Sequence, residues 1–157
     1  MTNVTEAKLS ECSVVTVERR LTAVIKTMVP MSEIPQVQRT LRPKIMATVK
    51  ALDVGPIGHT LTLWRPPIDG RLDMEPGILV GRTFEPVGEV VPSALPAGRA
   101  AHLVIVGPYD GLPQAWETLF DWCSKQRLKP AGINWEIYGD MVGNPPQPTT
   151  SLYRLLA

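Results

Sequence analysis

Apolar and polar residues alternate along residues 133–141, which predicts a β-strand. Because successive side chains of a strand point to opposite faces, Trp135 and the isoleucines beside it share one face, and Glu136 and Tyr138 share the other. The apolar face predicts packing into a core. The other face has two interpretations: a solvated surface, or a carboxylate beside a phenol that receives cationic or flat aromatic ligands. Periodicity alone favours the solvated surface.

Similar patterns predict further strands and two amphipathic helices. The strands are expected at residues 13–28, 59–64, 71–80, 88–95, 98–106, 133–141 and 149–156. A bulge or an interruption is expected at Glu75-Pro76-Gly77, because proline cannot donate to a strand ladder.

The first helix is predicted to follow Ser32, which we expect to be its N-cap, with Pro35 in its first turn. Apolar residues then recur at helical spacing as far as Leu52. Pro43 lies inside this pattern and would cost about 3 kcal/mol in a straight helix. A kink or a break is therefore predicted near Arg42.

The second helix is predicted to begin near Leu112, with Asp110 as its cap. Its apolar stripe contains Trp116, Trp122 and Cys123. These three side chains are interpreted as core residues, because a stripe at this spacing ordinarily packs against a sheet.

The order strand, helix, strand, strand occurs twice. Pro30 and Pro108, which end the strands before the helices, are 78 residues apart. Gly55 and Gly132, which precede the next strands, are 77 residues apart. This repeat predicts two similar halves related by a pseudo-twofold axis.

The predicted fold is α+β: a curved antiparallel sheet with two helices on one face and a ligand cleft between the halves. We expect one domain over residues 1–157, with halves at about 13–85 and 86–157.

Composition excludes several classes of protein. The 157 residues are 44% hydrophobic and 20% charged, and the formal net charge is +1. Scattered charge argues against nucleic-acid binding, and no apolar run is long enough for a bilayer. The polar stretch 1–10 has no signal-peptide core, so a cytoplasmic location is expected. Cys12 and the histidines fit no metal-ligand spacing, and no metal or cofactor is expected.

Four segments of the second half occur in an order that resembles the GyrI-like small-molecule-binding family, which is related to the effector-binding domains of AraC-type and MerR-type multidrug regulators. They are Gly107-Pro108-Tyr109-Asp110-Gly111-Leu112-Pro113, the tryptophan-bearing helix, Trp135-Glu136-Ile137-Tyr138 and Thr150-Ser151-Leu152-Tyr153. The resemblance covers residues 13–157, the first half only in pattern. It implies a duplicated strand-helix-strand-strand unit with a ligand cleft.

The resemblance implies which residues line that cleft. Glu136 matches the family's acidic residue, Tyr138 and Tyr153 match aromatic residues on neighbouring strands, and Tyr109 matches the Gly-Pro-Tyr turn. Two further candidates come from the sequence itself. Trp64 lies on the polar face of its strand, and Phe84 lies in a connecting segment that could cover the cleft.

Three functions remain open. The first is binding of an amphipathic, cationic or planar aromatic molecule by a monomer or homodimer. The second, which the resemblance implies, is hydrolysis of cyclopropane-containing DNA-alkylating natural products, with Glu136 activating water and Tyr138 bonding the substrate carbonyl. The third is inhibition of a DNA topoisomerase, which ranks last because the chain lacks the acidic surface of a DNA mimic.

The regulators carry a helix-turn-helix domain before this unit. About twelve residues precede the first predicted strand, so no DNA-binding domain is expected.

Overall fold

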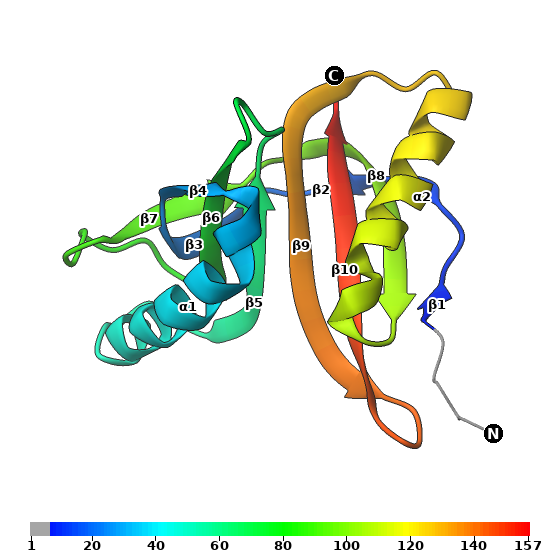
Figure 1. Ribbon diagram of the computed structural model, residues 1–157. Helices are drawn as coiled ribbons and strands as arrows, with labels where there is room; N and C mark the ends of the chain where they lie inside the picture. Colours follow the sequence, from blue (N-terminus) through cyan, green and yellow to red (C-terminus); the bar gives the residue numbers. More distant parts are fainter. Residues whose placement is uncertain (1–6) are drawn as a thin grey trace.

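The computed structural model describes residues 7–157, which form a curved antiparallel sheet covered on one face by two α-helices (Figure 1). The helices are α1 (Ile34–Lys50) and α2 (Leu112–Lys125), each preceded by a short 3-10 turn, η1 (Met31–Glu33) and η2 (Tyr109–Gly111). The strands are β1 (Lys8–Leu9), β2 (Ser13–Val17), β3 (Arg20–Ile25), β4 (Thr27–Pro30), β5 (Ile57–Trp64), β6 (Arg71–Val80), β7 (Val90–Leu95), β8 (Gly98–Val106), β9 (Pro130–Val142) and β10 (Gln147–Leu156). This arrangement confirms the predicted α+β class. Residues 1–6, most of the stretch assessed for a signal peptide, lie outside the described residues.

The described strands form one sheet in the order β1-β8-β10-β9-β5-β6-β3-β7, with β2 beside β8 and β4 beside β6. Along the chain a unit of four strands and one helix occurs twice, as β2-β3-α1-β5-β6 and β7-β8-α2-β9-β10. The first residues of α1 and α2, Ile34 and Leu112, are 78 positions apart. The opening strand of each unit pairs with the other unit: β2 lies beside β8, and β7 beside β3. The two units are therefore tied together by exchanged strands as well as by the central pair β5–β9.

The predicted single strand at residues 13–28 is wrong. Three strands replace it, because β2 pairs with β8 while β3 and β4 pair with β6. Between β2, which pairs with the second unit, and β3, which pairs within the first, the chain crosses at Glu18 and Arg19, which are both exposed. The charged run Glu18-Arg19-Arg20 interrupts the apolar pattern here, but the pattern does not indicate which strand each side of the run pairs with.

Both predicted helix caps are wrong. Helix α1 begins after η1 with Glu33 at the N-cap, and α2 begins after η2 with Gly111 there, in neither case with a side-chain capping bond. Helix α1 also runs unbroken past Pro43. The carbonyl that Pro43 leaves without an amide belongs to Arg39, and both residues are exposed, so water can satisfy it.

Strand β6 is continuous where a bulge or interruption was predicted, and its neighbour changes there instead. Residues 71–74 pair with β4, and residues 77–79 pair with β3. Pro76 lies between these two stretches, where no amide is needed on that side. Gly77 is required because a Cβ would approach the carbonyl oxygen of Ala23 to 2.5 Å.

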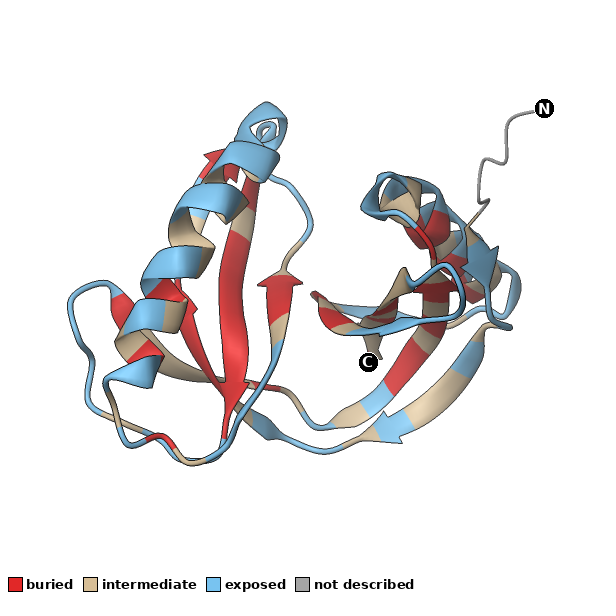
Figure 2. Cartoon of the chain, turned by 90° about the horizontal axis from the view of Figure 1, so that it is seen from below, coloured by how far each residue is buried: buried red, intermediate tan, exposed pale blue. Residues whose placement is uncertain are grey.

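Buried residues gather in the strands beneath each helix (Figure 2). Helix α2 packs on a cluster that includes Leu103, Ile105 and Leu152, and α1 packs on a cluster that includes Ile25 and Ile78. A third cluster surrounds the fully buried Trp135 and contains apolar residues of β5 and β9. These residues alternate along the strands with those that face the helices, so they point to the other face of the sheet. The helices thus each have their own core, and the central strands β5 and β9 join them.

Candidate functional site

The two central strands place Glu136 directly opposite Thr62. Trp135, one position away, belongs to the core cluster on the other face, as the alternation of residues 133–141 predicts. Glu136, Tyr138, Thr62 and Trp64 therefore share the face that carries the helices, at the junction of the two units.

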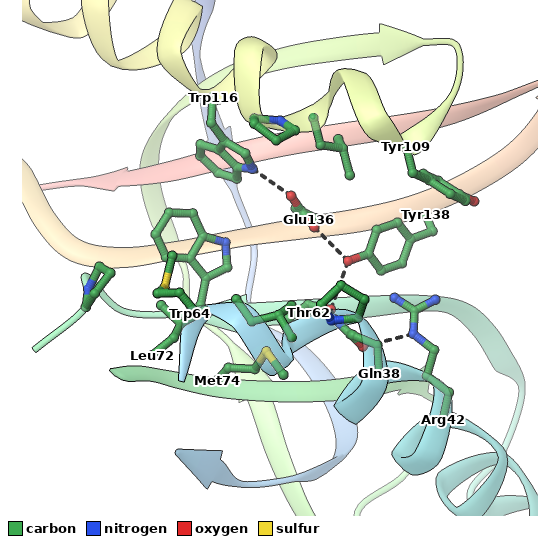
Figure 3. A pocket seen from close by; sticks show the side chains of 16 residues that line it. Gln38, Arg42, Thr62, Trp64, Leu72, Met74, Tyr109, Trp116, Glu136 and Tyr138 are labelled. Atoms are coloured by element: carbon green, nitrogen blue, oxygen red, sulfur yellow. Dashed lines mark hydrogen bonds between the residues drawn. The ribbon is translucent and has the colours of Figure 1, made fainter. Parts of the chain in front are cut away.

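A cavity of about 600 Å³ lies over this junction (Figure 3). Four pairs of its lining residues, each 78 positions apart, come from the starts of the two helical segments, namely Met31 and Tyr109, Ile34 and Leu112, Pro35 and Pro113, and Gln38 and Trp116. The strands and one loop supply the rest, namely Thr62, Trp64, Pro67, Leu72, Met74, Glu136 and Tyr138, and α1 adds Arg42. The cavity thus follows the pseudo-twofold arrangement, with mainly apolar walls and few polar groups.

Two donors hold the Glu136 carboxylate. The indole N–H of Trp116 donates to Oε2 at 2.6 Å, and the hydroxyl of Tyr138 donates to Oε1 at 2.6 Å. Short bonds of this kind are typical of ionised acceptors. The carboxylate is therefore oriented before any ligand arrives.

From Tyr138, hydrogen bonds continue to helix α1. Because the Tyr138 proton is given to Glu136, the hydroxyl of Thr62 donates to the phenol oxygen at 2.9 Å. The amide nitrogen of Gln38 donates to Thr62 at 2.7 Å, and Nε of Arg42 donates to the amide oxygen of Gln38 at 3.0 Å. Every bond in this chain directs its donor toward the acid, an arrangement in which bonds reinforce one another.

Burial and hydrogen bonding act in opposite directions on the acid. Burial raises the pKa of Glu136 above its ordinary value, and the bonds from Tyr138 and Trp116 and the charge of Arg42 only partly offset this. The pKa of Tyr138 is raised well above its ordinary value, by burial first and by the Glu136 charge second. Tyr138 therefore keeps its proton and serves as a donor.

Aromatic rings form two walls of the cavity. Trp64 meets Trp116 edge to face at 5.0 Å between ring centroids. On the other side, Tyr109 meets Tyr138 edge to face at 5.9 Å, and Tyr109 remains 52% exposed. Aromatic faces and edges of this kind suit flat or phenyl-bearing ligands.

Four of the six residues that the sequence nominated, Glu136, Tyr138, Trp64 and Tyr109, line the cavity. Tyr153 and Phe84 are not among the lining residues. Tyr153 stacks between His102 and Trp135, on the face of the sheet away from the helices. Phe84 packs against the core cluster beneath α1.

Sequence reasoning missed Trp116, Gln38 and Arg42. Trp116 was assigned to the core, and it is 7% exposed and does pack there, but its ring nitrogen also reaches Glu136. The 78-residue repeat held a usable signal, because it places Gln38 and Trp116 at equivalent positions on two helices that flank one junction. No comparable signal marks Arg42.

Neither a metal-holding cluster nor a membrane-spanning helix is found among residues 7–157. Between residues 7 and 157, no group of three or more histidine, cysteine or acidic side chains could hold a metal ion. None of the helices in that range has the length and apolar character needed to cross a membrane.

Comparison with known proteins identifies the family and the fold of the chain. Residues 10–153 match the family model described as a GyrI-like small molecule binding domain, whereas no curated protein matches the chain. The C-terminal domain of EcmrR is similar in structure, with a TM-score of 0.75 and 18% identity over 94% of this chain and 97% of that domain. EcmrR in the EcmrR–DNA complex of EcmrR-RPo gives a TM-score of 0.76 at 18% identity over 93% of this chain. This chain covers only 57% of that protein. SAV2435 bound to tetraphenylphosphonium gives 0.70 at 14% identity over 94% of both chains. At such low identities these likenesses establish the fold alone.

Proposed function

The chain belongs to the GyrI-like small molecule binding domain family, and on that basis we propose that its cavity binds cationic, amphipathic or planar aromatic small molecules. The observation that carries the proposal is the Glu136 carboxylate, held by Trp116 and Tyr138, at the wall of a largely apolar cavity of about 600 Å³. Cavities of this size and character hold drug-sized ligands.

Electrostatics favours a cation in this position. A positive charge about 4 Å from an ionised carboxylate gains about 4 kcal/mol at an effective dielectric constant of about 20. Burial makes the ionised form of Glu136 costly without a partner, and a bound cation would supply that partner. Trp64, Trp116 and Tyr109 would meanwhile contact the apolar or aromatic part of the same ligand.

The geometry favours binding over the hydrolytic alternative. Hydrolysis as outlined above requires Tyr138 to donate its proton to a substrate carbonyl, but this proton is directed to Glu136. Both oxygens of Glu136 already accept a hydrogen bond, so a water to be activated would have to share an oxygen with Trp116 or Tyr138. The alternative predicts turnover that Glu136→Gln abolishes while the substrate still binds.

Tetraphenylphosphonium is a suitable first probe, because a protein of the same fold binds it. We expect calorimetric titration to detect binding, and Glu136→Gln to weaken it at least tenfold, a loss of about 1.4 kcal/mol. Glu117→Gln is the matched control, because Glu117 is exposed on α2 and does not line the cavity. Absence of binding, or an equal loss in both variants, would contradict the proposal.

A further inference from the structure

Arg42 is the second charged residue of the cavity wall. Its guanidinium carbon lies 4.4 Å from the centroid of the Tyr138 ring, and its Nε donates to Gln38 (Figure 3). The phenol oxygen of the same side chain bonds Glu136, so Tyr138 contacts the cation with its ring face and the acid with its hydroxyl. The cavity therefore has one negative and one positive group that both contact a single aromatic side chain.

The terminal nitrogens of Arg42 have unused donors. Across residues 7–157, neither nitrogen donates to a protein acceptor, and no carboxylate of that stretch lies within 4.0 Å of the guanidinium. Over the same residues, the indole N–H of Trp64, another group of the cavity wall, meets no protein acceptor. By contrast, both oxygens of Glu136 already accept bonds. The polar groups of the wall that bond no protein atom are therefore donors, which water or an acceptor group of a ligand can satisfy.

The fold does not require a cation at position 42. The residue 78 positions later, Phe120 on α2, packs against the core cluster of its own unit and does not line the cavity. Other cavity residues of α1 have a counterpart on α2 that also lines the wall, as Gln38 has in Trp116. Arg42 thus departs from the repeat at the cavity itself.

A fixed cation would weaken the binding of a ligand that is purely cationic, since like charges repel across a cavity of low polarity. It strengthens binding when the ligand also carries a carboxylate or a comparable acceptor. Guanidinium offers a planar pair of donors that matches a carboxylate, and charge-assisted bonds of this kind are among the stronger ones in proteins.

We propose that the cavity selects dipolar ligands, in which an anionic or strong acceptor group contacts Arg42 while a cationic or aromatic part lies against Glu136 and Trp64. This inference rests on the proposed function, because it concerns the same cavity and adds the second polar group of its ligand.

A pair of matched probes tests this. Triphenylphosphonium bearing a para-carboxyphenyl group and its methyl ester share the cation and the shape, and they differ in one negative charge. We expect the wild-type protein to bind the acid about tenfold more tightly than the ester, as one charge-assisted contact would give. Arg42→Gln should abolish this preference, so that the acid and the ester bind with equal affinity.

Arg39→Gln serves as the control, because Arg39 is exposed on the same helix and does not line the cavity. It should keep the preference for the acid. If tetraphenylphosphonium binds through Glu136 but the acid is not preferred, or if Arg42→Gln keeps the preference, the dipolar inference is wrong and the proposed function stands. If none of the three probes binds, both are wrong.

Discussion

Gln38 and Trp116 occupy equivalent positions on the two helices, 78 residues apart, and each donates a hydrogen bond to the central strand pair. Gln38 bonds Thr62 at 2.7 Å, Trp116 bonds Glu136 at 2.6 Å, and the two acceptors face each other across β5 and β9. The scaffold is nearly symmetric at this point, but the chemistry is not, since a hydroxyl occupies one side and a carboxylate the other.

Replacing Trp116 tests whether this donor keeps the acid ionised. Trp116→Phe removes one bond that favours the charged form, so the pKa of Glu136 should rise further. At neutral pH we expect a loss of at least about tenfold in affinity for tetraphenylphosphonium, because a hydrogen bond to a charged group contributes about 1.5–3 kcal/mol. Titration over a range of pH should show the midpoint of binding shifted upward.

Trp122→Phe is the matched control for this change. Trp122 is half-buried on the same helix and packs against the same core, but it does not line the cavity. It should leave the midpoint where the wild-type protein has it. An equal shift in both variants would mean that loss of packing, rather than loss of the hydrogen bond, causes the effect.

Much of the scaffold could be predicted from sequence, because its signals are local. Alternation in residues 133–141 correctly assigned Trp135 to the core, and the strand at Gly98–Val106 has its predicted bounds. The exchange of β2 and β7 between the units could not be predicted, since strand partners depend on contacts distant in sequence. The caps at Ser32 and Asp110 failed because a 3-10 turn precedes each helix.

The site was predictable only in part, for a related reason. Glu136 and Tyr138 lie on one strand, so alternation alone places them together. Arg42 reaches the same site from a helix distant in sequence, and no periodicity connects the two segments. Tyr153, which was expected to line the cleft, lies opposite Trp135 in the strand pairing and so points to the other face of the sheet.

The raised pKa of Glu136 has two consequences for pH dependence. A cation prefers the ionised form, so affinity for tetraphenylphosphonium should fall as pH decreases, with a midpoint above the ordinary value of 4.5. In the folded protein a raised pKa favours the protonated carboxyl. Its contribution to stability is therefore full below the ordinary pKa of the unfolded chain, about 4.5, and is lost as pH rises through the folded value.

Comparison with Glu136→Gln isolates this contribution, because all other titrating groups are shared. The free energy of unfolding of the wild-type protein, relative to that of the variant, should decrease as pH rises above the ordinary pKa of about 4.5. Urea denaturation at several pH values measures the difference. A difference that is constant with pH, or that increases, would show that the pKa of the folded protein is not raised.

Trp64 provides the sharpest test of the aromatic wall, because it joins the two units within the cavity. It belongs to β5, packs edge to face on Trp116 of α2, and lies near Phe120 at 6.4 Å between ring centroids. Trp64→Ala should enlarge the cavity, weaken tetraphenylphosphonium binding at least tenfold, and lower stability by about 3 kcal/mol through lost packing. Trp64→Phe keeps a ring and should restore most of the stability and part of the affinity.

Tyr153→Phe, on the opposite face of the sheet, should leave affinity unchanged. Calorimetric titration of the three variants distinguishes the two faces, and a loss of binding in Tyr153→Phe comparable to that in Trp64→Ala would show that the ligand does not occupy this cavity.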